Sequence, residues 1–387
     1  MGLYIWRMVK ATGGKSMNEP IRVLHVLQRM EAAGVQTLLM NLYRKIDRNK
    51  VQFDFLVHYK TPQFFDKEID ELGGKIYRFS VREDYNFLKY YINLNHFFKK
   101  HKEYKIVHGH MHTLGGIYLH VAKKWGVPVR IAHSHTNSTQ YDFKRFIKII
   151  MNHLYAMDAN VLFACSSAAG KYMFDDKHFK VINNAIITDD FVFSKEKREA
   201  KRRELDIGNK LVIGNVGRFE IQKNQQFVVE IFEKLNLIYP DSVLLLVGTG
   251  SLLNSIQTIV KEKGLQNKIL FLGNRHDVAE LYQAMDAFLM PSLFEGLGIV
   301  GVEAQAAGTP TVCTDTLPIE LDVTPLIYRV SLNAPIDKWV TAILNSLENP
   351  LKHKNMKPYI VKANYDMDAL AKKMEAFYIK QYNLYVQ

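Results

Sequence analysis

The chain has 387 residues, of which 48% are hydrophobic and 23% are charged, and its formal net charge is +12. This length exceeds the usual size of one hydrophobic core, and this composition excludes a disordered chain. No uninterrupted apolar stretch is long enough to span a bilayer, and the two cysteines, Cys165 and Cys313, are too far apart for a disulfide framework or a zinc motif, so we expect a cytoplasmic protein. Residues 1–19 lack the apolar core of a signal peptide and are expected to be an extension outside the fold.

Short β-rich runs alternate with amphipathic, helix-like segments along the whole chain. In the first half, the expected strands are 21–27, 51–57, 105–110, 129–135, 160–165 and 180–183. In the second half, they are 211–216, 242–247, 268–272, 287–291, 309–313 and 326–330. Many of these runs are almost continuously apolar, which is typical of parallel strands that have helices on both faces.

Two such series predict an α/β fold in which two Rossmann-like, doubly wound domains face each other across a cleft. The first domain is expected to span residues 20–190 and the second residues 208–365. An exposed linker helix is expected in 191–207, and a last helix in 366–387 is expected to pack back on the first domain. Because open parallel sheets bind ligands at the carboxyl ends of their strands, functional residues are expected in the loops that follow the strands.

Histidines alternate at the end of the strand expected in 105–110. His108, His110 and His112 would share one face if the strand continued that far, and this spacing could hold a metal ion. Gly109 and the sequence Thr113-Leu-Gly-Gly instead indicate that the strand ends there, and no carboxylate lies nearby in the sequence. We therefore favour an arrangement in which His110 and His112 line the acceptor side of the cleft.

Basic residues suggest an anionic partner. The segment 141–154 combines aromatic, aliphatic and basic residues at helical spacing, so it predicts either a helix on an anionic membrane surface or a helix packed on the first domain with its lysines outward. The basic residues match no nucleic-acid-binding motif, and nucleic acid is not expected as a partner.

A cationic loop follows the first strand of the second domain. Its sequence is Gly214-Asn-Val-Gly217-Arg218-Phe-Glu-Ile-Gln-Lys223-Asn224. Arg218 and Lys223, held together on a short loop, can neutralise a diphosphate leaving group as charge develops on it.

A second glycine-bearing loop follows the strand that is expected to end at residue 291. It carries Glu295, Gly296 and Gly298, and a helix is expected to begin near Ile299. Glycines let the backbone approach a ligand, and the amides from Gly298 through Ile299 to Val300 suit a diphosphate because they begin a helix. Two carboxylates do not attract phosphate. Glu295 and Glu303, one turn into the helix, are therefore expected to bind sugar hydroxyls.

These two loops resemble those of the retaining glycosyltransferases of family 4, which have the two-domain GT-B architecture. The most specific matches are Glu295 and Glu303, separated by seven residues, and the Gly217-Arg-Phe…Lys223-Asn segment; the resemblance runs from about residue 21 to residue 385. It implies that Arg218 and Lys223 hold the donor diphosphate. It also implies that Glu303 binds the ribose hydroxyls and that Glu295 contacts the transferred sugar.

The resemblance assigns three further positions. Backbone near Asn274, in the segment 271–282, would meet the base of the nucleotide. Gly34, which follows Glu31-Ala-Ala, matches the glycine loop near the donor phosphates, with Ala33 where the family often has a second glycine. His135 matches a histidine that faces the reacting sugar, and His133 is the alternative for this role.

The sequence therefore predicts a retaining glycosyltransferase that moves a sugar from a nucleotide diphosphate sugar, by analogy a UDP-sugar, to a glycan or lipid-linked acceptor. By the same analogy, the product is a bacterial cell-surface polysaccharide such as an exopolysaccharide or capsule, and the enzyme could be peripheral on the inner face of the plasma membrane. No cofactor and no metal are expected, because none of the loops that follow the expected strands carries an Asp-x-Asp motif. The alternatives are a nucleotide-sugar epimerase of the same fold and a non-catalytic protein that binds polysaccharide or anions.

A Rossmann oxidoreductase is disfavoured. Its dinucleotide fingerprint requires Gly-x-Gly-x-x-Gly after a strand, but Gly248-Thr-Gly250 is followed by Leu253 where the third glycine belongs.

Overall fold

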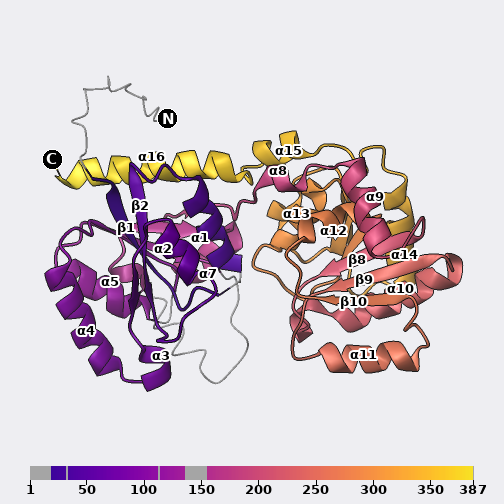
Figure 1. Cartoon of the computed structure of the whole chain (residues 1–387), viewed down its shortest axis with the longest axis horizontal. Helices are drawn as coiled ribbons and strands as arrows, with labels where there is room; N and C mark the ends of the chain where they lie inside the picture. Colours follow the sequence, from indigo (N-terminus) through magenta and orange to yellow (C-terminus); the bar gives the residue numbers. More distant parts are fainter. Residues whose placement is uncertain (1–18, 32–33, 112–113, 136–154, 387) are drawn as a thin grey trace.

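A computed structural model describes residues 19–31, 34–111, 114–135 and 155–386, which form two α/β domains side by side (Figure 1). The first domain contains a seven-stranded sheet with the spatial order β3 (Ile76–Arg78), β2 (Val51–Val57), β1 (Ile21–Val26), β4 (Ile106–Gly109), β5 (Val129–Ser134), β6 (Val161–Ala164) and β7 (Lys180–Val181). The second contains a six-stranded sheet with the order β10 (Ile269–Gly273), β9 (Ser242–Val247), β8 (Leu211–Val216), β11 (Ala287–Met290), β12 (Thr311–Thr314) and β13 (Ile327–Val330).

Neighbouring strands in both sheets pair in parallel, and helices connect them. The described helices of the first domain are α1 (Gly34–Lys45), α2 (Asp66–Glu71), α3 (Val81–Asp84), α4 (Phe87–Lys100), α5 (Gly115–Lys124) and α7 (Ser167–Phe174). Those that follow are α8 (Thr188–Phe191), α9 (Lys195–Glu204), η1 (Ile221–Lys223), α10 (Gln225–Ile238), α11 (Leu253–Glu262), α12 (Val278–Ala284), α13 (Ile299–Ala306), η2 (Ile319–Leu321), α14 (Ile336–Leu347), α15 (Lys357–Lys362) and α16 (Met367–Val386). The predicted fold of two doubly wound domains is confirmed.

The central strands are apolar on both faces because helices cover both faces. In β9, all six residues are buried. Leu245 and Val247 point into the core shared with α12 and α13, whereas Leu244 and Leu246 point into the core shared with α10 and α14. A strand of this kind has no polar side to alternate with the apolar one, which is why it is recognisable as an uninterrupted apolar run.

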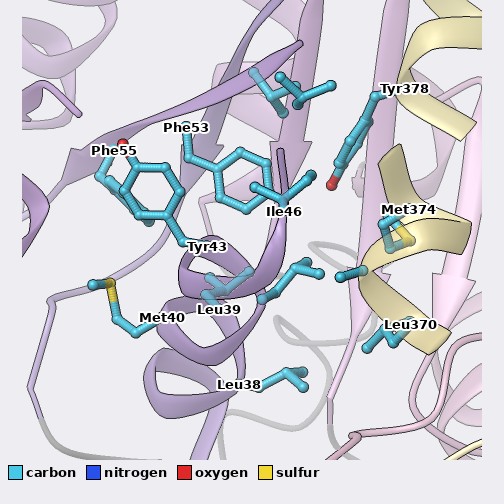
Figure 2. Close-up of a cluster of buried hydrophobic side chains, with 14 of the residues drawn as sticks. Leu38, Leu39, Met40, Tyr43, Ile46, Phe53, Phe55, Leu370, Met374 and Tyr378 are labelled. Carbon is cyan, nitrogen blue, oxygen red and sulfur yellow. The ribbon is translucent and has the colours of Figure 1, made fainter. Parts of the chain in front are cut away.

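The C-terminal helix α16 leaves the second domain and lies along the first (Figure 1). Leu370, Met374 and Tyr378, spaced four residues apart, form one stripe along the helix. Figure 2 shows this stripe facing Leu38 of α1 and Phe53 of β2, and all five side chains belong to one buried cluster. The first domain therefore completes its core with residues that lie more than 300 positions after Leu38 and Phe53 in the chain.

The chain crosses between the domains twice, and the two crossings lie side by side. Ile186 and Asp366 form a parallel bridge, and the N–H of Met367 donates to the carbonyl of Ile186 at 2.9 Å. The carboxylate of Asp366 accepts from the Thr188 hydroxyl at 2.9 Å and from the Ala369 N–H at 3.0 Å, which caps the start of α16.

The linker helix that we expected in 191–207 is present, but it is not exposed on all sides. This helix is α9, which packs against α12. Arg198 forms an ion pair with Asp286 at 2.6 Å, Lys201 pairs with Asp277 at 2.5 Å, and Arg202 donates to the carbonyl of Ala284 at 2.8 Å. The long side chains of α9 therefore cover the surface at α12, because acidic side chains and a carbonyl at the end of α12 bind their charged groups.

Candidate functional site

The cationic loop begins where β8 ends, and the side chain of Lys223 packs against Gly217. A Cβ at Gly217 would lie only 3.2 Å from Cδ and Cε of Lys223, so glycine leaves room for this side chain. Asn224 then adopts a left-handed conformation (φ 55°) that starts α10. The Lys223 ammonium lies 2.6 Å from Oε1 of Glu295. Arg218 is exposed, and within the described residues its guanidinium has no hydrogen-bond partner.

The loop after β11 brings Glu295 to this lysine and then turns into α13. Gly298 has φ +82°, and a Cβ there would approach Cε of Met290 to 2.6 Å, so the turn requires glycine. Helix α13 begins at Ile299, as the sequence predicts. The amides of Gly298, Ile299 and Val300 precede the first helical N–H donor, and the positive end of the helix is therefore available to an anion.

Glu303 lies one turn into α13 and is half-buried. The hydroxyl of Tyr282 donates to its Oε2 at 3.0 Å. Burial raises the pKa of Glu303 to about 7, while the bond from Tyr282 and the positive charge of Lys223 act to lower it. The carboxyl therefore changes charge near neutral pH.

The loop after β9 packs closely against the cationic loop. Gly248 has φ +128°, and a Cβ there would lie 2.1 Å from the carbonyl oxygen of Gly217; at Gly250 the corresponding distance to the Phe219 carbonyl oxygen is 2.4 Å. Gly248 and Gly250 thus allow the two loops to pack closely. This packing explains both glycines without a dinucleotide-binding motif. Nearby, the exposed side chain of Asn274 accepts from the Thr249 hydroxyl at 3.3 Å.

The first domain reaches the loop of Glu295 through its own strand ends. A Cβ at Gly296 would lie 3.3 Å from the carbonyl oxygen of His135, and the hydroxyl of Ser166 donates to the carbonyl of Gly296 at 3.4 Å. The backbone of Ser167 also donates to Glu320 at 3.0 Å. His135 therefore lies at the junction of the domains, beside the loop that holds Glu295.

His135 belongs to a cluster of histidines that the sequence analysis did not foresee. Its Nε2 lies 2.9 Å from Nδ1 of His110, and Nε2 of His110 lies 3.0 Å from Nδ1 of His25 in β1. In the neighbouring pair, Nε2 of His108 lies 3.1 Å from Nδ1 of His133. Burial lowers the pKa of His25 to about 3 and the pKa values of His108, His110 and His133 well below 6.5, so these rings are neutral at physiological pH.

The expected role of His110 on the acceptor side is not what its surroundings indicate. The side chain is buried, and both of its ring nitrogens contact other histidines. The pattern that could have revealed the cluster is a His-x-His pair at the end of two adjacent parallel strands, His108 with His110 and His133 with His135. His25 lies outside this pattern, and Tyr282 was noted only as part of the segment 271–282.

The remaining predicted positions either have no contact that indicates a role or lie outside the described residues. Gly34 begins α1 and is exposed, and a Cβ there would meet nothing within 4 Å. His112, Ala33 and the segment 141–154 lie outside the described residues. Within the described parts of the chain, none of the helices combines the length and apolar character that a membrane crossing requires.

Comparison with known proteins finds two family models that share the chain between them. Residues 32–190 match the model described as "Glycosyltransferase Family 4", and residues 197–363 match "Glycosyl transferases group 1". The chain is 34% identical over 332 residues to the putative glycosyltransferase EpsF of Bacillus subtilis strain 168, which covers 83% of this chain and 86% of EpsF.

Two further similarities extend over most of the chain. An Escherichia coli protein named UDP-Gal:alpha-D-GlcNAc-diphosphoundecaprenol alpha-1,3-galactosyltransferase is 25% identical over 315 residues, 78% of this chain and 81% of that protein. The crystal structure of HepE from Anabaena in complex with UDP has a TM-score of 0.77 and 16% sequence identity, and the match covers 92% of this chain and 99% of that one. At that identity, the likeness to HepE concerns the fold alone.

Proposed function

The chain belongs to the glycosyltransferases of family 4, and from this membership and the site geometry we propose that it transfers a sugar, with retention of configuration, from a UDP-sugar to a glycan or lipid-linked acceptor. One observation carries the proposal. Lys223, Glu295 and the N-terminus of α13 converge at the carboxyl ends of β8 and β11, with Glu303 on the same helix.

The donor would bind with its diphosphate against Lys223, Arg218 and the first amides of α13. Cations and helix amides are the groups that receive phosphate oxygens best. Glu303 would accept hydrogen bonds from the ribose hydroxyls. The choice of UDP is supported by the E. coli relative, whose name gives UDP-Gal as its donor.

In the proposed reaction, the bond between the sugar and the diphosphate breaks as the anomeric carbon acquires oxocarbenium character. Lys223, Arg218 and the helix amides stabilise the negative charge on the departing UDP. The acceptor hydroxyl attacks from the face that the diphosphate leaves, and a phosphate oxygen takes its proton. Glu295 and His135 would contact the sugar from opposite domains. A bound sugar would therefore favour closure of the domains, and closure would exclude water.

Donor binding is proposed to be independent of a metal ion. Magnesium and manganese at a diphosphate are held by oxygen ligands, usually carboxylates. Here, Lys223 lies beside Glu295, and on donor binding its ammonium would supply the positive charge that a metal would otherwise provide.

The acceptor is proposed to be a growing bacterial cell-surface polysaccharide, such as an exopolysaccharide or capsule unit on a lipid carrier. The E. coli relative's name specifies an acceptor linked to diphosphoundecaprenol. With an acceptor of this kind, the enzyme would work peripherally at the cytoplasmic face of the membrane.

A transfer assay tests the proposal. The purified protein is incubated with labelled UDP-sugars and membranes that contain polyprenyl-diphosphate sugars, and label in the lipid fraction is measured. We expect label to transfer from at least one UDP-sugar and to be lost in Lys223→Ala, while the circular dichroism spectrum is unchanged. Conversion of the UDP-sugar without acceptor would indicate an epimerase, and nucleotide binding without turnover on any acceptor would indicate a binding protein; either result contradicts the proposal.

A further inference from the structure

Three histidines at the junction of the domains have the arrangement of a metal site. His110, His133 and His135 each offer one ring nitrogen, and these nitrogens all lie within 4.8 Å of one another. Nδ1 of His110 and Nε2 of His135 are 2.9 Å apart. Nitrogens bound to one tetrahedral Zn²⁺, with Zn–N bonds of about 2.0–2.1 Å, are roughly 3.3 Å apart, so side-chain rotations that change these separations by about 1.5 Å or less suffice.

A second group, His25, His108 and His110, also has nitrogens within 4.8 Å of one another, but it is less suitable. Both nitrogens of His108 are engaged, with the Tyr378 hydroxyl at 2.8 Å and with His133 at 3.1 Å. In contrast, only Nδ1 of His133 is engaged. Its Nε2 is buried without a hydrogen-bond partner among the described residues, which is costly unless a ligand is present.

The two inner histidines suit a supporting role. Metal-binding histidines usually donate their other N–H to a neighbouring acceptor, which fixes the tautomer and presents the lone pair to the metal. His110 can donate through Nε2 to His25, and His133 can donate through Nδ1 to His108. His108 can then donate to the oxygen of Tyr378. Each buried ligand therefore has its orienting partner.

We propose that Nδ1 of His110, Nε2 of His133 and Nε2 of His135 bind one Zn²⁺ ion, with water as the fourth ligand. Imidazole is a preferred ligand of Zn²⁺, and three protein ligands with one open position are typical of zinc sites that exchange a ligand. His110 and His133 are buried, whereas His135 is partly exposed, and the ion would enter from the side of His135.

This site differs from the one proposed for the donor diphosphate. Its ligands are nitrogens of the first domain, and the cations that would receive phosphate lie on the second; only His135 is shared with the proposed sugar contacts. The zinc proposal does not rest on the transfer reaction, because metal binding is measured directly. Loss of transfer activity and loss of zinc binding can therefore be told apart.

The test uses the full chain without a histidine tag, treated with a chelator and then titrated with Zn²⁺ by calorimetry. We expect one ion per chain. His135→Asn, a change at a partly exposed position, is expected to weaken binding by at least about 100-fold, more than the roughly 10- to 100-fold loss typical of removing an orienting partner. Tyr378→Phe, which removes a partner of His108 and touches none of the three ligands, is expected to weaken binding by less than this range. His96→Gln, at an exposed position away from the cluster, should leave binding unchanged.

Cobalt gives a second readout of the same site. Co²⁺ in place of Zn²⁺ is expected to produce the intense visible absorption of a tetrahedral nitrogen site, and His133→Asn should abolish it while thermal unfolding shows a folded protein. Absence of stoichiometric Zn²⁺ binding would overturn the proposal. So would binding that survives His135→Asn and His133→Asn, because the metal would then lie elsewhere.

Discussion

The Lys223 ammonium and Oε1 of Glu295 lie 2.6 Å apart, with Lys223 on the loop after β8 and Glu295 on the loop after β11. Both side chains are largely withdrawn from solvent, at 15% and 7% exposure. The proposed diphosphate ligand is thus paired with the proposed sugar ligand before any donor is bound. Donor binding must then draw Lys223 toward phosphate and leave Glu295 free to accept hydrogen bonds from the sugar.

This ion pair predicts opposite effects on nucleotide affinity for its two members. Lys223→Ala removes the cation and leaves the charge of Glu295 close to the diphosphate, so UDP affinity is expected to fall by about 10- to 100-fold. Glu295→Gln releases Lys223 from its partner, and UDP is expected to bind at least as tightly as in the native protein. Both variants should lose transfer activity. Isothermal titration with UDP measures the affinity of both variants. Equal losses of affinity would contradict the idea that Glu295 competes with the diphosphate for Lys223.

Glu303 predicts a pH dependence of nucleotide binding. The pKa of its carboxyl is about 7, and ribose hydroxyls donate to the ionised form. UDP affinity is therefore expected to rise with pH through 7, by roughly tenfold between pH 6 and pH 8 if only the carboxylate binds. Binding should also release a proton near pH 6.5, which calorimetry in buffers of different ionisation enthalpy detects.

Two variants separate this effect from other titrations. Glu303→Gln should bind UDP weakly at every pH, with a flat profile. Tyr282→Phe removes the hydrogen bond that lowers the pKa of Glu303, so the midpoint of the profile should move to higher pH. A native profile that persists in Glu303→Gln would assign the titration to another group.

Gly298 predicts a local requirement for glycine at the start of α13. Gly298→Ala combines a positive φ with a Cβ 2.6 Å from Met290, so a loss of about 1–3 kcal/mol in the free energy of unfolding is expected, together with weaker UDP binding. Gly264→Ala is the matched control, because Gly264 also has a positive φ but its Cβ would meet nothing within 4 Å. Denaturant unfolding should show a smaller loss for the control and no change in its UDP affinity.

Asp366 predicts a stabilising contribution at the crossing between the domains. Asp366→Ala removes the cap of α16 and the bond from Thr188, and a loss of about 1–2 kcal/mol is expected. The control is Asp368→Ala, which breaks only an exposed pair with Lys45 and should cost less than about 1 kcal/mol. Thermal unfolding of the two variants compares them, and equal shifts would argue against a special role for the crossing.

Much of the fold was predictable because buried parallel strands are apolar runs bounded by polar loops. The runs 51–57, 211–216 and 242–247 coincide with β2, β8 and β9. Strand β3 was missed, since its three half-buried residues make no apolar run. Helix α9 was expected as an exposed linker helix because its sequence is dominated by charge, and only the structure reveals that it packs on the second domain, where Asp277 and Asp286 receive that charge.

The parts of the site that lie within one segment of the chain were predictable from the sequence. The parts that depend on how neighbouring strands align were not. The loop of Glu295 and the first residue of α13 follow from glycine spacing within one segment. The histidine cluster requires the alignment of β1, β4 and β5, which brings His25 opposite His108. The two His-x-His pairs could indicate a cluster at the ends of β4 and β5, but a single sequence does not contain the alignment with β1, and so the contact of His110 with His25 was not foreseen.

A crystal structure of the protein with UDP tests the central claim most directly. We predict the pyrophosphate within hydrogen-bond distance of the Lys223 ammonium and of the amides of Gly298 to Val300, with the ribose hydroxyls on Glu303. Pyrophosphate bound anywhere else, or a Lys223 side chain still paired only with Glu295 while UDP occupies its site, would contradict the account.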